Sequence, residues 1–366
     1  MAEAGPGRPH RSPTIDDVAR AAGVATSTVS RAFSRPGRVS FETSERIHRI
    51  AAELGYRSTS LARALPTART SMIALAISDI TNPFYNEIIR GAQTAASEAG
   101  YTILLADTQE SGTHERTALD RAVSAVEGIV LATTRMPDSA IRMTAKQRPV
   151  IVLNRAVNDV PCVVTDIPRG MRRAVEHLAE LGHQRITYLA GPEASWSDGM
   201  RWRSLRESAL ELELQTRRIG PFPPTVAGGA RAAVEFAANP TTAVIAYNDL
   251  VAIGAIRALT ALGASVPRDV SVVGFDNIFA AELVTPPLTT VAAPLLAMGR
   301  TAVGNLLAIV RGARPHSQAP VSLPCRLVVR ASTAQRRRYR TSPAWATTSV
   351  SSSAASRSRS TEDGSR

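Results

Sequence analysis

The chain has 366 residues, 44% of them hydrophobic and 20% charged, which is the composition of a globular protein with two or three domains. Lysine and arginine outnumber aspartate and glutamate by 43 to 31, a formal net charge of +12 that favours a polyanionic partner such as nucleic acid. The sequence contains no apolar run of about 18 residues, and residues 1–10 (MAEAGPGRPH) lack the apolar segment of a secretory signal. We therefore predict a cytoplasmic protein without a membrane partner.

Changes of composition divide the chain into five segments. Residues 1–13 are rich in Pro, Gly and Arg and are predicted to be a disordered arm, whereas 14–57 are helical in pattern. Residues 58–70 form a linker with a short helical centre, and 71–333 alternate between strand-like and helix-like stretches. The Arg- and Ser-rich residues 334–366 are predicted to be a disordered tail. That tail is either an extension without a function or an auxiliary phosphate-binding segment.

The segment 14–57 predicts three short helices. Thr14 and Asp17 have the spacing of a capping box, which satisfies backbone amides at a helix start. Gly23 ends this first helix, a second begins near Thr26, and a third covers roughly residues 41–54. Two short helices joined by a Gly-containing turn indicate a helix-turn-helix.

The second helix presents small polar side chains and one arginine to the outside. Its pattern leaves Thr26, Ser27, Ser30 and Arg31 facing outward, and side chains of these types can contact base edges in the major groove. Residues 1–70 carry eleven arginines against six acidic residues, a net charge of +5. This excess favours double-stranded DNA as the partner over the alternative, a three-helix module that binds protein.

The long segment predicts an α/β core. Helical patterns lie between several apolar runs, and glycines follow three of them. Such alternation indicates parallel sheets, and about 260 residues is long for one open sheet, so we expect two α/β lobes. The predicted strands are Met72–Ile77, Thr102–Ala106, Gly128–Ala132, Val150–Leu153, Ile186–Ala190, Ala243–Tyr247 and Val270–Phe275. The clearest helices are Asn86–Glu98, Arg169–Leu181 and Leu250–Leu262.

Polar and aromatic side chains follow four of these strands. Asn82 and Phe84 come after the first, Asn154 after the fourth, Asn248 after the sixth and Asp276 after the last. Ligands of open α/β sheets bind at the carboxyl ends of the strands, and amide and carboxylate groups suit the hydroxyls of a sugar or nucleoside. Because Asn and Asp after a strand also cap helices, capping remains the alternative at Asn248 and Asp276.

The chemistry of an enzyme is poorly represented. No GxSxG, P-loop or strand-to-helix GxGxxG motif occurs. Cys162 and Cys325 have neither zinc spacing nor that of a disulfide framework. His177 and His183 flank a predicted helix end, where histidine commonly interacts with the helix dipole. We therefore expect no catalytic residue, cofactor or metal.

The residues of the first helices resemble one known family along their whole length. The order TIDDVARAAGVATSTVSRAF is similar to the DNA-binding headpiece of the lactose-repressor/galactose-repressor family of bacterial transcriptional regulators. The resemblance continues to about residue 333 through NPFYNEIIRGAQTAASEAGY, HLAELGHQRITYLAGP, AYNDLVAIGAIRAL, VPRDVSVVGFDNI and PPLTTV. It implies an all-α headpiece joined to a two-lobed α/β core similar to periplasmic binding proteins.

The resemblance also implies roles for particular residues in DNA binding. Thr26, Ser27 and Arg31 match the family's base-reading positions. Leu61–Leu65 match a hinge helix that orders on operator DNA, with Leu65 as a minor-groove wedge and Ala62 small enough for close approach. A flexible linker is the alternative for this segment.

The same resemblance supports Asn82, Phe84, Asn154, Asn248 and Asp276 as effector-side positions. Arg203 matches by spacing the arginine that grips the effector. That region departs from the family pattern, however, and an alignment shifted by two would select Arg201.

The sequence therefore predicts a homodimeric repressor-type regulator. Its partners would be operator DNA and a small effector, a sugar or a nucleoside, bound between two lobes. A ligand that closes the lobes would alter the dimer and thereby the hinge helices. The alternatives are a solute-binding protein for sugar uptake and an α/β enzyme fused to a DNA-binding module.

Overall fold

A computed structural model describes residues 13–34, 37–56, 70–313, 319–336 and 345–346. It divides into two compact units, Met1–Thr70 and Ser71–Arg366, and each is described by itself. No helix among the described residues is long and apolar enough to span a membrane.

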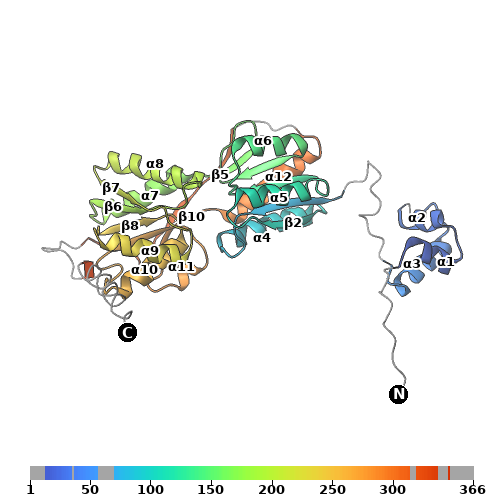
Figure 1. Ribbon diagram of the computed structural model, residues 1–366, viewed down its shortest axis with the longest axis horizontal. Helices are drawn as coiled ribbons and strands as arrows, with labels where there is room; N and C mark the ends of the chain where they lie inside the picture. The colour runs from blue at the N-terminus through green and yellow to red at the C-terminus, as the bar shows by residue number, and fades with distance from the viewer. Residues whose placement is uncertain (1–12, 35–36, 57–69, 314–318, 337–344, 347–366) are drawn as a thin grey trace, which may run out of the picture. The chain divides into compact units, whose positions relative to one another are not determined.

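The first unit is a bundle of three helices, α1 (Ile15–Ala22), α2 (Thr26–Ser34) and α3 (Phe41–Glu53) (Figure 1). The predicted capping box is present, since the Thr14 amide donates to Asp17 Oδ2 at 2.8 Å and the Asp17 amide donates to Thr14 Oγ1 at 3.4 Å. Gly23 ends α1 in the left-handed conformation, φ 64°. Val18, Val29 and Ile47, one from each helix, are fully buried and form the centre of the small core.

The second unit consists of two α/β lobes, each built on a six-stranded sheet (Figure 1). In the first lobe the strand order is β11-β5-β4-β3-β1-β2, and in the second it is β12-β10-β9-β8-β6-β7. The strands of the first sheet are β1 (Met72–Ile77), β2 (Thr102–Asp107), β3 (Gly128–Ala132), β4 (Val150–Leu153), β5 (Cys162–Thr165) and β11 (Val321–Leu323). Those of the second are β6 (Arg185–Leu189), β7 (Gln215–Ile219), β8 (Ala243–Ala246), β9 (Ser271–Asp276), β10 (Thr289–Ala292) and β12 (Arg326–Val328).

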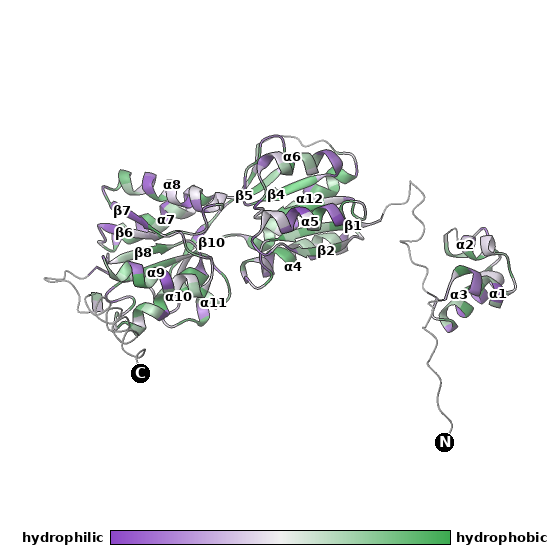
Figure 2. Cartoon of the chain, viewed as in Figure 1, coloured by the Kyte–Doolittle hydropathy of each residue, from purple (hydrophilic) through white to green (hydrophobic). Residues whose placement is uncertain are grey.

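Helices cover both sheets, and most of the strands between them are hydrophobic, as Figure 2 shows; the edge strand β7 (QTRRI) is an exception. The helices of the second unit are α4 (Phe84–Glu98), α5 (Gly112–Ala122), α6 (Asp138–Gln147), α7 (Ile167–Glu180), α8 (Trp196–Glu211), α9 (Val226–Ala237), α10 (Asp249–Ala261), α11 (Ala280–Leu283) and α12 (Leu295–Val310). The chain passes between the lobes after β5, after β10 and again between β11 and β12. The lobes are therefore joined at one edge by several crossing segments.

Each lobe contains one helix pair that packs through glycine. A Cβ on Gly91 of α4 would lie 2.1 Å from the Leu296 carbonyl oxygen of α12, and one on Gly299 would lie 2.1 Å from the carbonyl oxygen of Ile88. In the second lobe, a Cβ on Gly254 of α10 would lie 2.0 Å from the Val226 carbonyl oxygen of α9. Glycine is required at these positions because the two backbones touch there.

The predicted fold class is confirmed, and the seven predicted strands are present within one residue at either end. The sequence missed β5, β7, β10, β11 and β12, which are short or lack a long apolar run. The expectation of parallel pairing is wrong at one position, because β12 pairs with β10 antiparallel.

The predicted tail, 334–366, is wrong in its two described segments. The Ala334 amide donates to Ser271 Oγ at 3.0 Å, and the Arg336 amide donates to the Leu181 carbonyl at 2.8 Å, so the core continues past residue 333. Trp345 is 7% exposed and stacks on Phe236 with ring centroids 6.4 Å apart. One buried indole contributes enough apolar area to hold a short segment against the core. The average composition of the tail did not predict this contact, because a single tryptophan changes that average little.

Candidate functional site

The two lobes enclose a cleft lined by the carboxyl ends of their strands. Five of the six residues expected at an effector site lie in it: Asn82, Phe84, Asn154, Asn248 and Asp276. Asn82 and Phe84 follow β1, Asn154 follows β4, Asn248 follows β8, and Asp276 ends β9. The sheets converge on this point because all of these strands run parallel, so their carboxyl ends share one edge of each sheet.

Arg201 of α8 occupies the centre of the second-lobe wall. Its side chain is buried, donates to Asp276 Oδ1 at 3.0 Å and also donates to the Tyr247 carbonyl. The guanidinium carbon lies 3.7 Å from the centroid of the Phe275 ring. Burial raises the pKa of Asp276 to about 6, and Arg201 partly opposes this rise. The pair is therefore a buried ion pair whose acidic partner is held ionised at neutral pH mainly by one arginine.

Asp249 stabilises the backbone next to this ion pair. It is fully buried, accepts from the Ile278 amide at 2.8 Å and accepts from Thr290 Oγ1 at 2.5 Å. These bonds fix the loop that begins at Asp276, whose backbone has φ 108°, a conformation that is costly for a residue other than glycine. Burial, and next the charge of Asp276, raise the pKa of Asp249 to about 8.

The asparagines are oriented by local hydrogen bonds. Asn248 Oδ1 accepts from the Val251 amide at 2.9 Å and caps α10, which is the capping alternative considered above. Its Nδ2 donates to the Pro224 carbonyl at 3.3 Å. Asn82 Oδ1 accepts from the Phe84 amide at 3.0 Å. One residue can both cap a helix and line the cleft, because the N-termini of these helices lie at the carboxyl ends of the strands.

The first-lobe wall carries a second ion pair, which was not predicted from the sequence. Arg135 Nε donates to Glu110 Oε2 at 2.7 Å, and the arginine side chain is 8% exposed. Thr133, in the left-handed region at φ 59°, bonds through Oγ1 to the Tyr85 hydroxyl and to Ser78 Oγ. Burial raises the pKa of Tyr85 above its usual range.

These residues also follow the carboxyl ends of strands, as the predicted effector-site residues do. Thr133 and Arg135 come directly after β3, and Glu110 comes after β2. Both strands are among those predicted from the sequence, so extending the search for polar side chains to every strand end would have selected them. Tyr247, which directly follows β8, fits the same pattern, whereas Ser197 of α8 also lines the cleft but carries no such signal.

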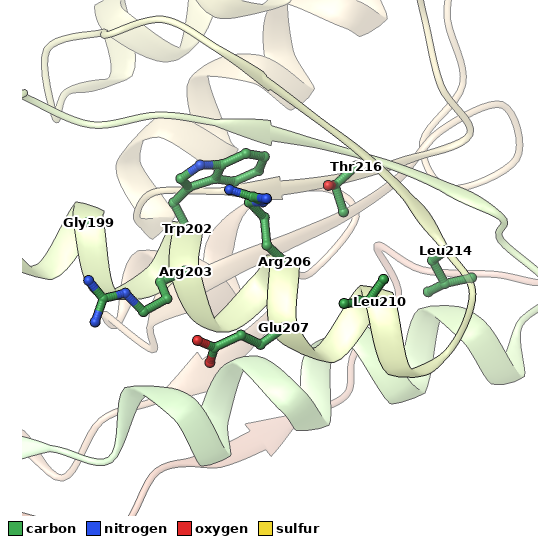
Figure 3. A pocket seen from close by; sticks show the side chains of 8 residues that line it. All are labelled: Gly199, Trp202, Arg203, Arg206, Glu207, Leu210, Leu214 and Thr216. Atoms are coloured by element: carbon green, nitrogen blue, oxygen red, sulfur yellow. The ribbon is translucent and has the colours of Figure 1, made fainter.

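Arg203, the arginine chosen by spacing, does not lie in the cleft. It is exposed on the other side of α8 and lines a separate surface pocket of about 580 Å³ with Trp202, Arg206 and Glu207, shown in Figure 3. The alternative alignment, shifted by two residues, therefore selects the arginine that lies in the cleft, Arg201.

The cleft is narrow in this conformation. Its cavity measures about 30 Å³, which is space for water and too little for a sugar. Ser197 of the second lobe donates to the Asn154 carbonyl of the first at 3.2 Å, so the lobes touch directly. A ligand of sugar size therefore requires the lobes to separate.

The headpiece presents its predicted reading residues on α2. Thr26, Ser27 and Arg31 are exposed and Ser30 is half-buried. Thr26 Oγ1 donates to Asp16 Oδ1 of α1 at 3.0 Å, which fixes the start of α2. Ala62 and Leu65, the predicted hinge contacts, lie outside the described residues.

Within the described part of the chain, no group of three or more His, Cys, Asp or Glu residues is placed to hold a metal ion. His183 bonds to Thr242 Oγ1 at 2.9 Å and to Ser271 Oγ at 3.0 Å, and burial lowers its pKa to about 4. These contacts give it a structural role in the second lobe.

Comparison with known proteins identifies both units. Residues 14–58 match the model of bacterial regulatory proteins of the lacI family, and residues 175–333 match a periplasmic binding protein-like domain. The chain is 33% identical to the HTH-type transcriptional repressor CytR of Escherichia coli K12, over 87% of this chain and 96% of CytR. It is 35% identical to the HTH-type transcriptional regulator DegA of Bacillus subtilis, over 87% of this chain and 98% of DegA.

Solved structures show the same similarity. The Lac repressor dimer bound to operator and the anti-inducer ONPF has a TM-score of 0.77 at 28% identity, and the match covers 88% of this chain and 100% of the Lac repressor chain. The complex of the transcriptional regulator CelR with cellobiose has a TM-score of 0.66 at 31% identity, covering 87% and 99% of the two chains. The protein therefore belongs to the LacI family of bacterial regulatory proteins.

Proposed function

We propose that this protein is a homodimeric, sequence-specific DNA-binding transcriptional repressor of the cytoplasm, controlled by a small polyhydroxylated effector that binds between its lobes. The observation that carries the proposal is the buried Arg201–Asp276 pair, held at the carboxyl ends of the strands in a chain that also bears a helix-turn-helix. Its relatives are named as repressors and regulators, and the CelR relative was solved with cellobiose.

The proposed reading surface is α2. Exposed Thr26, Ser27 and Arg31 offer hydroxyl and guanidinium groups to base edges, and Ser30 lies at the margin of this surface. Residues 58–70 would form the hinge, with Ala62 and Leu65 in the minor groove. Because the family's operators are read by paired headpieces, we propose a near-palindromic site.

The proposed effector site is the cleft, with Arg201 in place of Arg203. Asn82, Phe84, Asn154, Asn248 and Asp276 would contact the ligand together with it. Effector binding would hold the two lobes in a relation different from that of the empty protein. That difference would favour or oppose the dimer geometry in which both hinges reach DNA.

The alternatives account for less of the chain. A sugar-uptake protein has no use for the helix-turn-helix, and a fused enzyme needs a reacting group. In the described lining of the cleft, each acidic side chain forms an ion pair with an arginine, and two tyrosines lie in the same lining. The hydroxyl of each tyrosine has a hydrogen-bond partner. We therefore propose that the protein has no catalytic activity.

The test uses DNA sites selected from a random library by the full-length protein. Arg31→Ala should weaken the selected site by about 1–3 kcal/mol and relax the preference at one base position. Equal weakening on selected and random DNA would contradict a base-reading role. Leu65→Ala should reduce DNA bending in a circular-permutation gel shift, and unchanged bending would contradict the wedge.

The effector arm of the test compares Asp276→Asn with the unaltered protein by calorimetry against a panel of sugars and nucleosides. Losing a charge-assisted hydrogen bond of about 1.5–3 kcal/mol should weaken binding at least about tenfold, with binding to the selected DNA retained. Normal affinity in a folded variant would mean that Asp276 has only a structural role.

A further inference from the structure

We infer that the cleft selects an uncharged ligand and rejects phosphorylated or otherwise anionic ones, because each arginine that lines it is neutralised by a carboxylate of the same wall. This inference rests on the proposed function, since it concerns the effector of that site. Such a cleft would discriminate between sugars or nucleosides and their phosphate esters. The presence of asparagine and aspartate at the strand ends does not by itself favour either class of ligand.

The first-lobe wall is neutral by itself. Arg135 contacts Glu110 through two nitrogens, Nε at 2.7 Å and a terminal nitrogen at 2.6 Å from Oε2. Both side chains line the cleft, and the arginine is the more buried of the two. This contact uses two of the five N–H donors of the guanidinium, and the carboxylate cancels the positive charge that would attract a ligand phosphate.

The second-lobe wall repeats this arrangement. Arg201 donates to Asp276 at 3.0 Å, and both side chains are almost fully buried. The lining of the cleft among the described residues thus has two cations, Arg135 and Arg201, and two anions, Glu110 and Asp276. Their formal charges cancel.

Neighbouring arginines are paired as well. Arg155, next to Asn154, forms an ion pair with Asp138, and Arg218 lies 2.6 Å from Asp198. These two arginines therefore add no uncompensated positive charge near the walls.

Two further carboxyl groups stand behind the lining. Asp249 is fully buried, and Glu115 accepts from the Arg135 amide at 2.9 Å. Burial raises the pKa of each. When protonated they are neutral, and when ionised they make the site negative, so neither state helps an anion to bind.

The remaining lining suits an uncharged ring. Phe84, Tyr85 and Tyr247 supply aromatic surface, and the Phe84 and Tyr85 rings meet edge to face with centroids 5.0 Å apart. Asn82, Asn154 and Thr133 supply neutral polar groups. A phosphate monoester would bring roughly −1.5 to −2 charges at pH 7 into this site without a matching cation, and an uncompensated charge in a closed cleft is costly.

The experiment measures calorimetric affinity of the full-length protein for matched ligand sets. The probes are glucose and glucose phosphorylated at its primary hydroxyl; ribose and its phosphate; cellobiose; and adenosine and its monophosphate. We expect a neutral member to bind and the phosphorylated member of its set to bind at least roughly a hundredfold more weakly. A phosphate ester that binds as tightly as its neutral parent, or more tightly, overturns the inference.

Glu110→Gln tests the cause of the selectivity. It keeps a hydrogen-bond acceptor for Arg135 while leaving one positive charge uncompensated, so the preference for the neutral ligand should shrink at least about tenfold. Arg135→Gln combined with Glu110→Gln restores neutrality and should restore the preference. Glu207→Gln, on the exposed pocket of Figure 3 outside the cleft, is the matched control and should change nothing.

Two failures are distinguishable. If the folded Glu110→Gln protein keeps the full preference, charge balance is not the cause and the inference is overturned while the effector site stands. If no probe of any set binds the unaltered protein, the proposed function fails for these ligand classes, and the inference fails with it.

Discussion

Replacing Arg201 of α8 with alanine should destabilise the protein strongly, whereas replacing Arg203 of the same helix should change its stability little. Arg203→Ala removes an exposed side chain, and a change of this kind usually alters stability by no more than about 0.5 kcal/mol. Arg201→Ala removes the partner of a buried carboxylate and the cation that lies over the Phe275 ring. Sequence spacing had favoured the exposed arginine, so this comparison tests the placement of α8 directly.

The magnitude follows from the environment of Asp276. Breaking a buried ion pair by removing one partner costs about 3–5 kcal/mol, a large part of a typical unfolding free energy of about 5–15 kcal/mol. The pKa of Asp276 is already raised to about 6 by burial, with Arg201 opposing the rise. Without Arg201 that pKa rises further, and Asp276 becomes protonated in the folded core.

The pH dependence gives the sign. An aspartate whose pKa is raised by folding favours the folded state most at pH values below its unfolded pKa, and this stability is lost as the pH rises to the folded pKa. In the unaltered protein the loss falls between about pH 4 and 6. In Arg201→Ala it should extend above pH 6, so lowering the pH from 8 to 5 should recover part of the lost stability.

The assay is urea unfolding of both variants at pH 8 and pH 5. We expect the midpoint of Arg201→Ala to fall by at least about 1 M at pH 8, to recover partly at pH 5, and that of Arg203→Ala to stay unchanged. Equal midpoints for the two variants at pH 8, or a deficit that does not depend on pH, would refute the account of the buried pair.

Further predictions concern the core. Gly254→Ala should destabilise by about 1–3 kcal/mol in urea unfolding, because its Cβ meets a carbonyl of α9. Gly304→Ala, whose Cβ meets no atom within 4 Å, should be neutral or stabilising, and equal losses would contradict helix contact as the cause. The pKa of His183 is lowered to about 4, so its neutral form contributes about 3 kcal/mol of stability that is lost as the pH falls from 6.5 to 4. His183→Gln should flatten this part of the pH–stability curve, and an unaltered curve would contradict this role of His183. Trp345→Ala should cost about 3–5 kcal/mol and lower Tm, whereas an unchanged Tm would show that the indole does not stabilise the core.

Local features of the sequence determined the first unit. The capping box of Thr14 and Asp17 and the stop at Gly23 depend on atoms a few residues apart, so they act before any long-range contact forms. The apolar runs determined most strands in the same way, since a buried parallel strand is hydrophobic on both faces. The strand ends then located Asn82, Asn154 and Asp276, because chain direction in a parallel sheet decides which ends meet.

Tertiary packing decided what these patterns leave open. Residues two apart on a helix point about 200° apart, so the rotation of α8 alone decides whether Arg201 or Arg203 enters the cleft. The buried face of α8 contains Ser197, Asp198 and Ser204 as well as Leu205, so hydrophobic periodicity did not mark it. The pairing of Arg135 with Glu110 joins residues 25 apart, and the place of Trp345 on Phe236 joins still more distant ones. Contacts of this kind depend on which surfaces the folded chain brings together, and no short stretch of sequence specifies that.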